Sequence, residues 1–135
     1  MDPMLTLKEF FAIQRNLKKI SDTWSDLWTI LHLCKGSPGR ILRLKFTDTD
    51  TGRLTFRASD ELVQGYQNIT SGINTIISLR RERYPDDVYV FQSHTNRFQS
   101  TPRPVTLIAF NAALKKASRD VTNKTVSSKS AFYLK

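Results

Sequence analysis

A turn followed by two short strand-like segments constrains the fold of this chain most. Residues 48–52 read Asp-Thr-Asp-Thr-Gly, a composition typical of a tight turn. Residues 53–57 then alternate, with Leu54 and Phe56 apolar and an arginine at each end, which predicts a strand with a basic outer face. A weaker second strand is expected over residues 63–69, after a turn near residues 59–61. The pattern therefore predicts a small antiparallel sheet.

Helical patterns account for most of the remaining chain. Residues 6–9 have the Thr-x-x-Glu pattern of a capping box, and apolar residues then recur every three or four positions up to Ile20. Further helices are expected from Ser25 to Gly36, from Pro38 through Leu44, from residue 70 or 71 to residue 81, and over residues 105–119. The apolar face of the last helix is expected at Ile108, Ala109 and Ala112, flanked by Leu107, Phe110 and Leu114. The fold class is predicted to be α+β, with a small antiparallel sheet flanked by helices in a single domain over residues 1–135.

The charge of the chain points to a polyanionic partner. The sequence holds 21 basic and 12 acidic residues, which gives a net charge of +9 and an isoelectric point near 10.0. Residues 101–135 alone hold seven basic residues and one acidic residue, a net charge of +6. Nucleic acid is the simplest polyanion for a protein this basic, and the alternative is a solvated basic surface.

Several other classes of function lack their usual signals. Cys34 is the only cysteine, so no internal disulfide forms, and the start of the chain does not read as a signal peptide. We expect a cytoplasmic protein with no membrane segment, because no apolar run approaches the roughly 20 residues of a membrane span. No metal and no cofactor are expected, since the sequence has neither a usual metal-ligand spacing nor a glycine-rich phosphate loop. His32 is expected to be packed or half-buried in a helix, and His94 to be solvated in a loop.

Four segments, taken in order, resemble the catalytic domain of tyrosine recombinases of the phage-integrase type. They cover residues 4–10, 26–50, 84–93 and 105–117. The sharpest match is residues 44–50, Leu-Lys-Phe-Thr-Asp-Thr-Asp, which is similar to the family's "L-R-W-S-D-I-D". Residues 113–117, Ala-Leu-Lys-Lys-Ala, are similar to a helix that follows in the family. The resemblance implies the fold of that catalytic domain.

The same resemblance implies that the chemistry of the family is lost. Its members cleave a phosphodiester with a tyrosine nucleophile, while two arginines, a histidine-type donor and a lysine general acid assist. The alignment places Ser37 and Phe132 at the two arginines, Asp60 at the lysine and Lys129 at the histidine. The segment for the tyrosine would lie beyond Lys135. No enzyme activity is expected from such a domain.

The function implied is that of a catalytically inactive, integrase-like DNA-binding protein that regulates transcription, recombination or transfer of a mobile element. The alternative is a protein-interaction module that binds and modulates an active recombinase, or that self-associates. About half of the basic residues near the matched segments are expected to touch DNA phosphates. The candidates are Arg40, Arg43, Lys45, Arg57, Arg97, Arg103, Lys115, Lys116, Arg119, Lys124 and Lys129.

Overall fold

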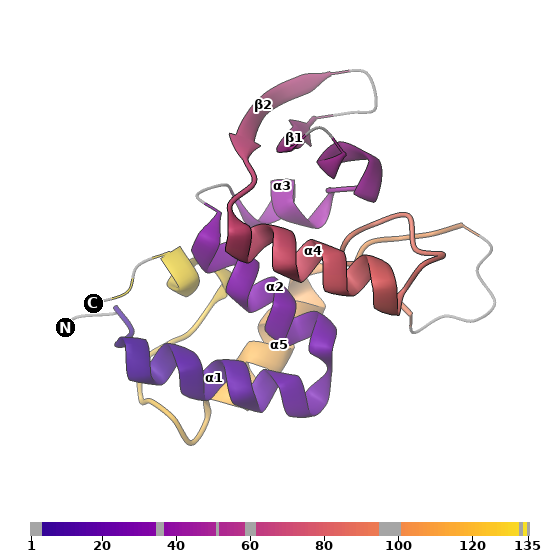
Figure 1. Ribbon diagram of the computed structural model, residues 1–135. Coiled ribbons are helices and arrows are strands. Elements are labelled where there is room, and N and C mark those ends of the chain that lie inside the picture. Colours follow the sequence, from indigo (N-terminus) through magenta and orange to yellow (C-terminus); the bar gives the residue numbers. More distant parts are fainter. Residues whose placement is uncertain are drawn as a thin grey trace. The chain divides into compact units, whose positions relative to one another are not determined.

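The computed structural model describes residues 4–34, 37–50, 52–58, 62–94, 101–132 and 134 (Figure 1). Within these ranges the chain forms five α-helices, two short 3-10 helices and one two-stranded antiparallel sheet. The predicted α+β class with a small antiparallel sheet is therefore confirmed. The fold divides into two compact units: unit 1 holds residues 1–38 and 106–135, and unit 2 holds residues 39–105. The single domain predicted over residues 1–135 stays a prediction.

Unit 1 begins with two helices that share one serine at their junction. The helix α1 (Leu7–Ile20) starts at the predicted capping box, in which the Thr6 hydroxyl accepts from the Glu9 amide at 3.1 Å and the Glu9 carboxylate accepts from the Thr6 amide at 2.9 Å. Ser21 ends α1 and caps α2 (Asp22–Leu33), since its hydroxyl accepts from the Thr23 amide at 3.2 Å. The predicted cap at Ser25 is wrong, because Ser21 satisfies the free amides of the helix one turn earlier.

The core of unit 1 is built on stacked rings. Phe10 lies on the inward stripe of α1, and its ring stacks on that of Trp28 at a centroid distance of 5.1 Å. The indole nitrogen of Trp28 donates to the Phe10 carbonyl at 3.2 Å, so this buried polar group is satisfied. Around these rings the core of α1 and α2 contains Ile13, Leu17, Leu27, Ile30, Leu31 and Cys34.

The helix α5 (Leu107–Ser118) is rotated relative to the prediction. Its buried residues are Phe110, Ala113, Leu114, Ala117 and Ser118, whereas Ile108 is 85% exposed and Ala109 and Ala112 lie on the surface. The predicted inward face is therefore wrong. Of the predicted flank, Phe110 and Leu114 lie on the buried face, whereas Leu107 is exposed. Phe110 sets the rotation, because it is the largest apolar side chain of the helix and packs on Trp24 at a centroid distance of 5.7 Å. Ile108 is two residues away, on the opposite side of the helix.

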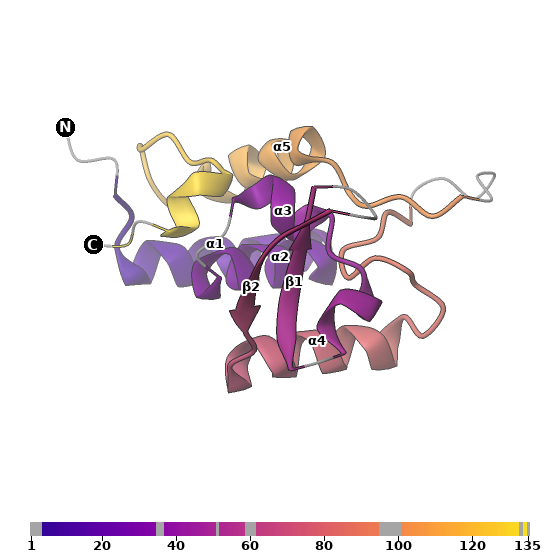
Figure 2. The same cartoon turned by 90° about the horizontal axis from the view of Figure 1, so that it is seen from above.

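In unit 2 a hairpin packs against a short 3-10 helix. The short helix α3 (Pro38–Leu42) begins at the predicted proline and crosses the boundary between the units, and η1 (Phe46–Thr49) follows it. The strands β1 (Arg53–Arg57) and β2 (Val63–Asn68) are paired in antiparallel fashion, and η1 lies against β1 (Figure 2). Gly52 precedes β1 with φ 77°, a left-handed conformation that favours glycine.

The helix α4 (Ser71–Arg83) completes unit 2 and contains a buried arginine. Thr70, one of the two predicted caps, caps it by accepting from the Ile73 amide at 3.4 Å. Arg80 lies inside the unit, where its Nε donates to the Val90 carbonyl at 2.6 Å and its guanidinium lies 5.1 Å from the ring centres of Tyr84 and Phe91. No helix in the part of the chain that the structure describes is long and apolar enough to cross a membrane.

Candidate nucleic-acid interface

The last turn of α5 presents exposed cations. Leu114 and Ala117 face the core of unit 1, which directs Lys115 and Lys116 outward, and Arg119 follows at the C-cap. Lys115 and Arg119 share one side of the helix because they are four residues apart. Cations are also favourable at this end of the helix, because it carries the negative end of the helix dipole. The helix can therefore offer several cations to a polyanion without weakening its own fold.

The connector after α5 presents one further cation. The 3-10 helix η2 (Ser128–Phe132) is fixed to α5, since the Ser128 amide donates to the Asn111 side chain at 3.2 Å. It is fixed to α2 as well, because His32 Nδ1 lies 2.9 Å from the Ala131 carbonyl. A carbonyl oxygen only accepts, so His32 carries its proton on Nδ1. These bonds hold η2 while the side chain of Lys129 stays exposed.

Lys124 serves the fold of unit 1. Its ammonium donates to the Glu9 carboxylate at 2.9 Å and to the Met4 carbonyl at 2.8 Å. The pKa of Glu9 is lowered from 4.5 to about 2, chiefly by the hydrogen bond from the Thr6 amide, then by hydrogen bonds from the Lys124 and Thr122 side chains and by the charge of Lys124. A phosphate would have to break this ion pair to reach Lys124. The exposed residues Lys115, Lys116, Arg119 and Lys129 are called the C-terminal cations below.

Three of the predicted cations of unit 2 have partners inside that unit. Arg57 is paired with the buried Asp48 carboxylate, with 2.7 Å between Nε and Oδ1. Arg43 donates from Nη1 to the carbonyl of Ala58, the residue after β1, at 3.3 Å. Lys45 places its ammonium 5.7 Å from the ring centre of Tyr89.

The remaining predicted positions are spread over both units. Arg40 is half-buried in α3. Arg103 is exposed, and its backbone carbonyl accepts from the Ser93 amide at 2.8 Å. Among the degenerate catalytic positions, Ser37 is exposed just before α3 and Lys129 is exposed in η2, while Phe132 is the last residue of η2. Arg97 and Asp60 lie outside the described residues.

Two features of unit 2 were missed in the sequence. Arg53 is exposed, and its guanidinium lies 5.6 Å from the ring centre of Tyr66. The alternation around Leu54 predicts the outward side chain at position 53, but the contact with Tyr66 was not predicted. His94 is 39% exposed in a loop, as predicted, but its two partners were not expected. Its Nε2 lies 2.7 Å from an oxygen of Asp87, and its ring stacks on that of Tyr84 at a centroid distance of 4.5 Å. No local sequence signal marks this pair, because Asp87 and His94 are joined by an irregular segment.

An open hollow lies at the start of α4. Its volume is about 480 Å³, and its one titratable lining residue is Asp50, which is already paired with Arg81 at 2.9 Å. The other lining residues are Thr49, Gly52, Ile69, Thr70, Ser71 and Asn74. Among the described residues no three His, Cys, Asp or Glu side chains are grouped so that they would hold a metal ion.

No protein-family model, curated protein or solved structure matches this chain. The relation to tyrosine recombinases therefore stays a hypothesis that rests on the residues quoted from the sequence.

Proposed function

We propose that this protein binds double-stranded DNA through its phosphates and does not cleave it. The observation that carries the proposal is the group of C-terminal cations, which are exposed on elements held in place by the core of unit 1. Lysine and arginine contacts of this kind fix a protein on the DNA backbone without reading its sequence.

The charge balance of unit 1 supports the same proposal. Its residues include eleven basic and five acidic side chains, a net charge of +6. Asp120 is the only acidic residue in the sequence from residue 106 onward. Glu9, an acidic residue of the first helix, is already paired with Lys124. A positive potential at the C-terminal cations is therefore opposed by few carboxylates, and such a potential attracts nucleic acid.

The resemblance to tyrosine recombinases points to a biological role for the proposed DNA binding. In that family the domain binds duplex DNA, and the catalytic positions of this chain hold Ser37, Asp60, Lys129 and Phe132. Serine, aspartate and phenylalanine supply no positive charge to a phosphorane. The proposed role is regulation of transcription, recombination or transfer of a mobile element by DNA binding without strand cleavage.

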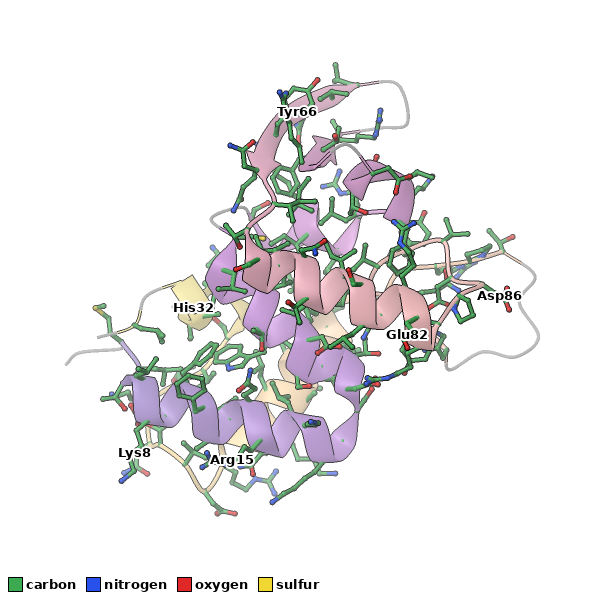
Figure 3. The ribbon with its side chains drawn as sticks, in the orientation of Figure 1. Lys8, Arg15, His32, Tyr66, Glu82 and Asp86 are labelled. Carbon is green, nitrogen blue, oxygen red and sulfur yellow. The ribbon has the colours of Figure 1, made fainter. Side chains whose placement is uncertain are left out.

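A comparison of two charge-matched variants tests the proposal. The first variant replaces the four C-terminal cations by Gln. The second replaces four exposed cations of α1, Lys8, Arg15, Lys18 and Lys19, by Gln, so both lose four positive charges. Lys8 and Arg15 extend outward from α1 in Figure 3. Affinity for a 20-base-pair duplex of arbitrary sequence is measured by fluorescence anisotropy at fixed salt.

We expect the first variant to bind at least tenfold more weakly than the parent, and the α1 variant to bind within about threefold of it. Equal losses in both variants would mean that only the net charge matters. A parent protein that does not bind duplex at low salt would contradict the proposal outright. Circular dichroism of all three proteins confirms that they are equally folded.

A protein partner is the second candidate function. Leu7 and Phe11, one turn apart on α1, are 52% and 45% exposed, and apolar side chains at this spacing suit contact with another protein. Co-purification with an active tyrosine recombinase, lost in Leu7→Ser/Phe11→Ser and kept in the variant without C-terminal cations, would favour this function over DNA binding.

A further inference from the structure

The outer face of the hairpin in unit 2 carries an exposed aromatic ring beside a cation. Tyr66 projects from β2 and is 61% exposed (Figure 3). In the register of the two strands Thr55 lies opposite Tyr66 and Arg53 lies opposite Asn68, so these four side chains share one face. Arg53 is the diagonal neighbour of Tyr66, and its guanidinium lies 5.6 Å from the ring centre.

The geometry leaves much of the ring available to a planar ligand. Thr55 is buried on this face although it is polar, whereas its cross-strand partner Tyr66 is largely exposed to solvent. A single exposed aromatic residue is ordinary on a protein surface. The composition around this one is more restrictive, because Arg53 lies beside the ring and neither β1 nor β2 contains a carboxylate, whereas Arg57 is already paired with Asp48. An aromatic ring on a basic strand pair matches a ligand that has both a flat apolar face and a negative charge.

We propose that Tyr66 and Arg53 form a stacking platform for an unpaired base of single-stranded DNA. The base stacks on the Tyr66 ring, and the Arg53 guanidinium contacts a neighbouring phosphate. Paired bases have both faces covered within a duplex, so the platform acts only where the strands are separated or frayed. Stacking of this kind tolerates any base, because every base has a π-face. The inference rests on the proposed DNA binding and adds to it a site that distinguishes unpaired from paired DNA.

Two probes of equal charge separate stacking from phosphate contact. The first is a 15-nucleotide oligothymidylate, and the second is an abasic strand with the same number of phosphates. The variants are Tyr66→Ala, Tyr66→Leu and Tyr66→Phe, with Gln64→Ala as a control at another exposed position of β2. Tyr66→Leu keeps apolar bulk without a ring, which provides a second test if Tyr66→Ala loosens the hairpin.

We expect Tyr66→Ala and Tyr66→Leu to weaken oligothymidylate binding about tenfold and to leave abasic-strand binding unchanged. Tyr66→Phe and Gln64→Ala should match the parent on both probes. Arg53→Gln should weaken both probes, because it removes a phosphate contact. Equal binding of oligothymidylate by the parent and both ring-less variants, or equal losses on both probes, would overturn the platform.

The same experiment keeps the two proposals apart. A parent that binds the duplex, with Tyr66 variants that leave oligothymidylate affinity unchanged, would remove the platform and keep the proposed function. A parent that binds none of the three DNA probes would remove both proposals.

Discussion

Lys124 and Lys129 lie five positions apart in one connector, yet their side chains have different surroundings. Lys124 donates to Glu9 and Met4 and ties the connector to the start of α1. Lys129 is exposed on a 3-10 helix whose backbone is fixed by Asn111 and His32. At the residue scale, the structure therefore assigns Lys124 to stability and leaves Lys129 exposed to solvent.

The hydrogen bond from the Thr6 amide to Glu9, together with the contact of Glu9 with Lys124, should make stability depend on pH in the acidic range. The pKa of Glu9 falls from 4.5 to about 2 on folding, so its stabilising contribution is complete above pH 4.5 and is lost as the pH falls toward 2. Thermal unfolding followed by circular dichroism between pH 5 and pH 2 should show this decline. Glu9→Gln keeps an acceptor for the Thr6 amide and should flatten the decline. A variant with the same pH dependence as the parent would contradict this role of Glu9.

The positions that the hypothesis of a recombinase relation aligns with catalytic residues predict that the protein forms no covalent adduct with DNA. Phosphodiester cleavage needs several positive groups at the phosphorane, and Ser37, Asp60 and Phe132 supply none of them. Incubation with nicked suicide duplexes, followed by denaturing electrophoresis, should show free DNA and free protein only. A denaturation-resistant adduct that maps to any tyrosine would refute catalytic inactivity.

At the element scale, local signals were sufficient for the ends of several elements. Neighbouring residues alone indicate the capping box at Thr6, the proline start of α3, a cap of α4 at residue 70 or 71, and a strand over Arg53–Arg57. The structure confirms these signals, with Thr70 as the cap, although Thr55 is buried where the alternation predicts an outward side chain. The rotation of α5 was not predictable in this way, because both of its sides are apolar. Packing of Phe110 on Trp24, far away in the sequence, decides which side is buried. The burial of Arg80 likewise depends on Val90 and Phe91, which lie beyond the end of its helix.

The rotation of α5 predicts an unequal effect of two similar substitutions. Phe110→Ala should lower the free energy of unfolding by about 3–5 kcal/mol, because it leaves a cavity next to Trp24. Ile108→Ala should change it by less than about 0.5 kcal/mol, since the Ile108 side chain is already in water. Urea unfolding of both variants measures the two values. A larger loss for Ile108→Ala than for Phe110→Ala would show that the opposite face of the helix is buried.

At the scale of the whole molecule, the excess of positive charge was evident in the sequence. The sequence did not show which cations pair with groups inside the fold and which stay exposed. Unit 1 carries a net charge of +6 and unit 2 a net charge of +3, the latter from ten basic and seven acidic residues. Several predicted contact residues of unit 2 already have partners inside it, such as Arg57 with Asp48. The sequence shows how many cations exist, whereas exposure depends on tertiary packing. The exposure of the Tyr66 ring could not be predicted for the same reason, because it depends on tertiary packing.

The salt dependence of duplex affinity tests DNA binding by the C-terminal cations most directly. Four phosphate contacts should give a slope of log K against log salt of roughly −3.6, at about −0.9 per contact. Lys115→Ala, Lys116→Ala and Arg119→Ala combined should weaken binding to all sequences alike and flatten the slope by about two to three units. A combined variant that remains folded by circular dichroism, yet binds duplex as tightly as the parent with an unchanged slope, would contradict DNA binding through these cations.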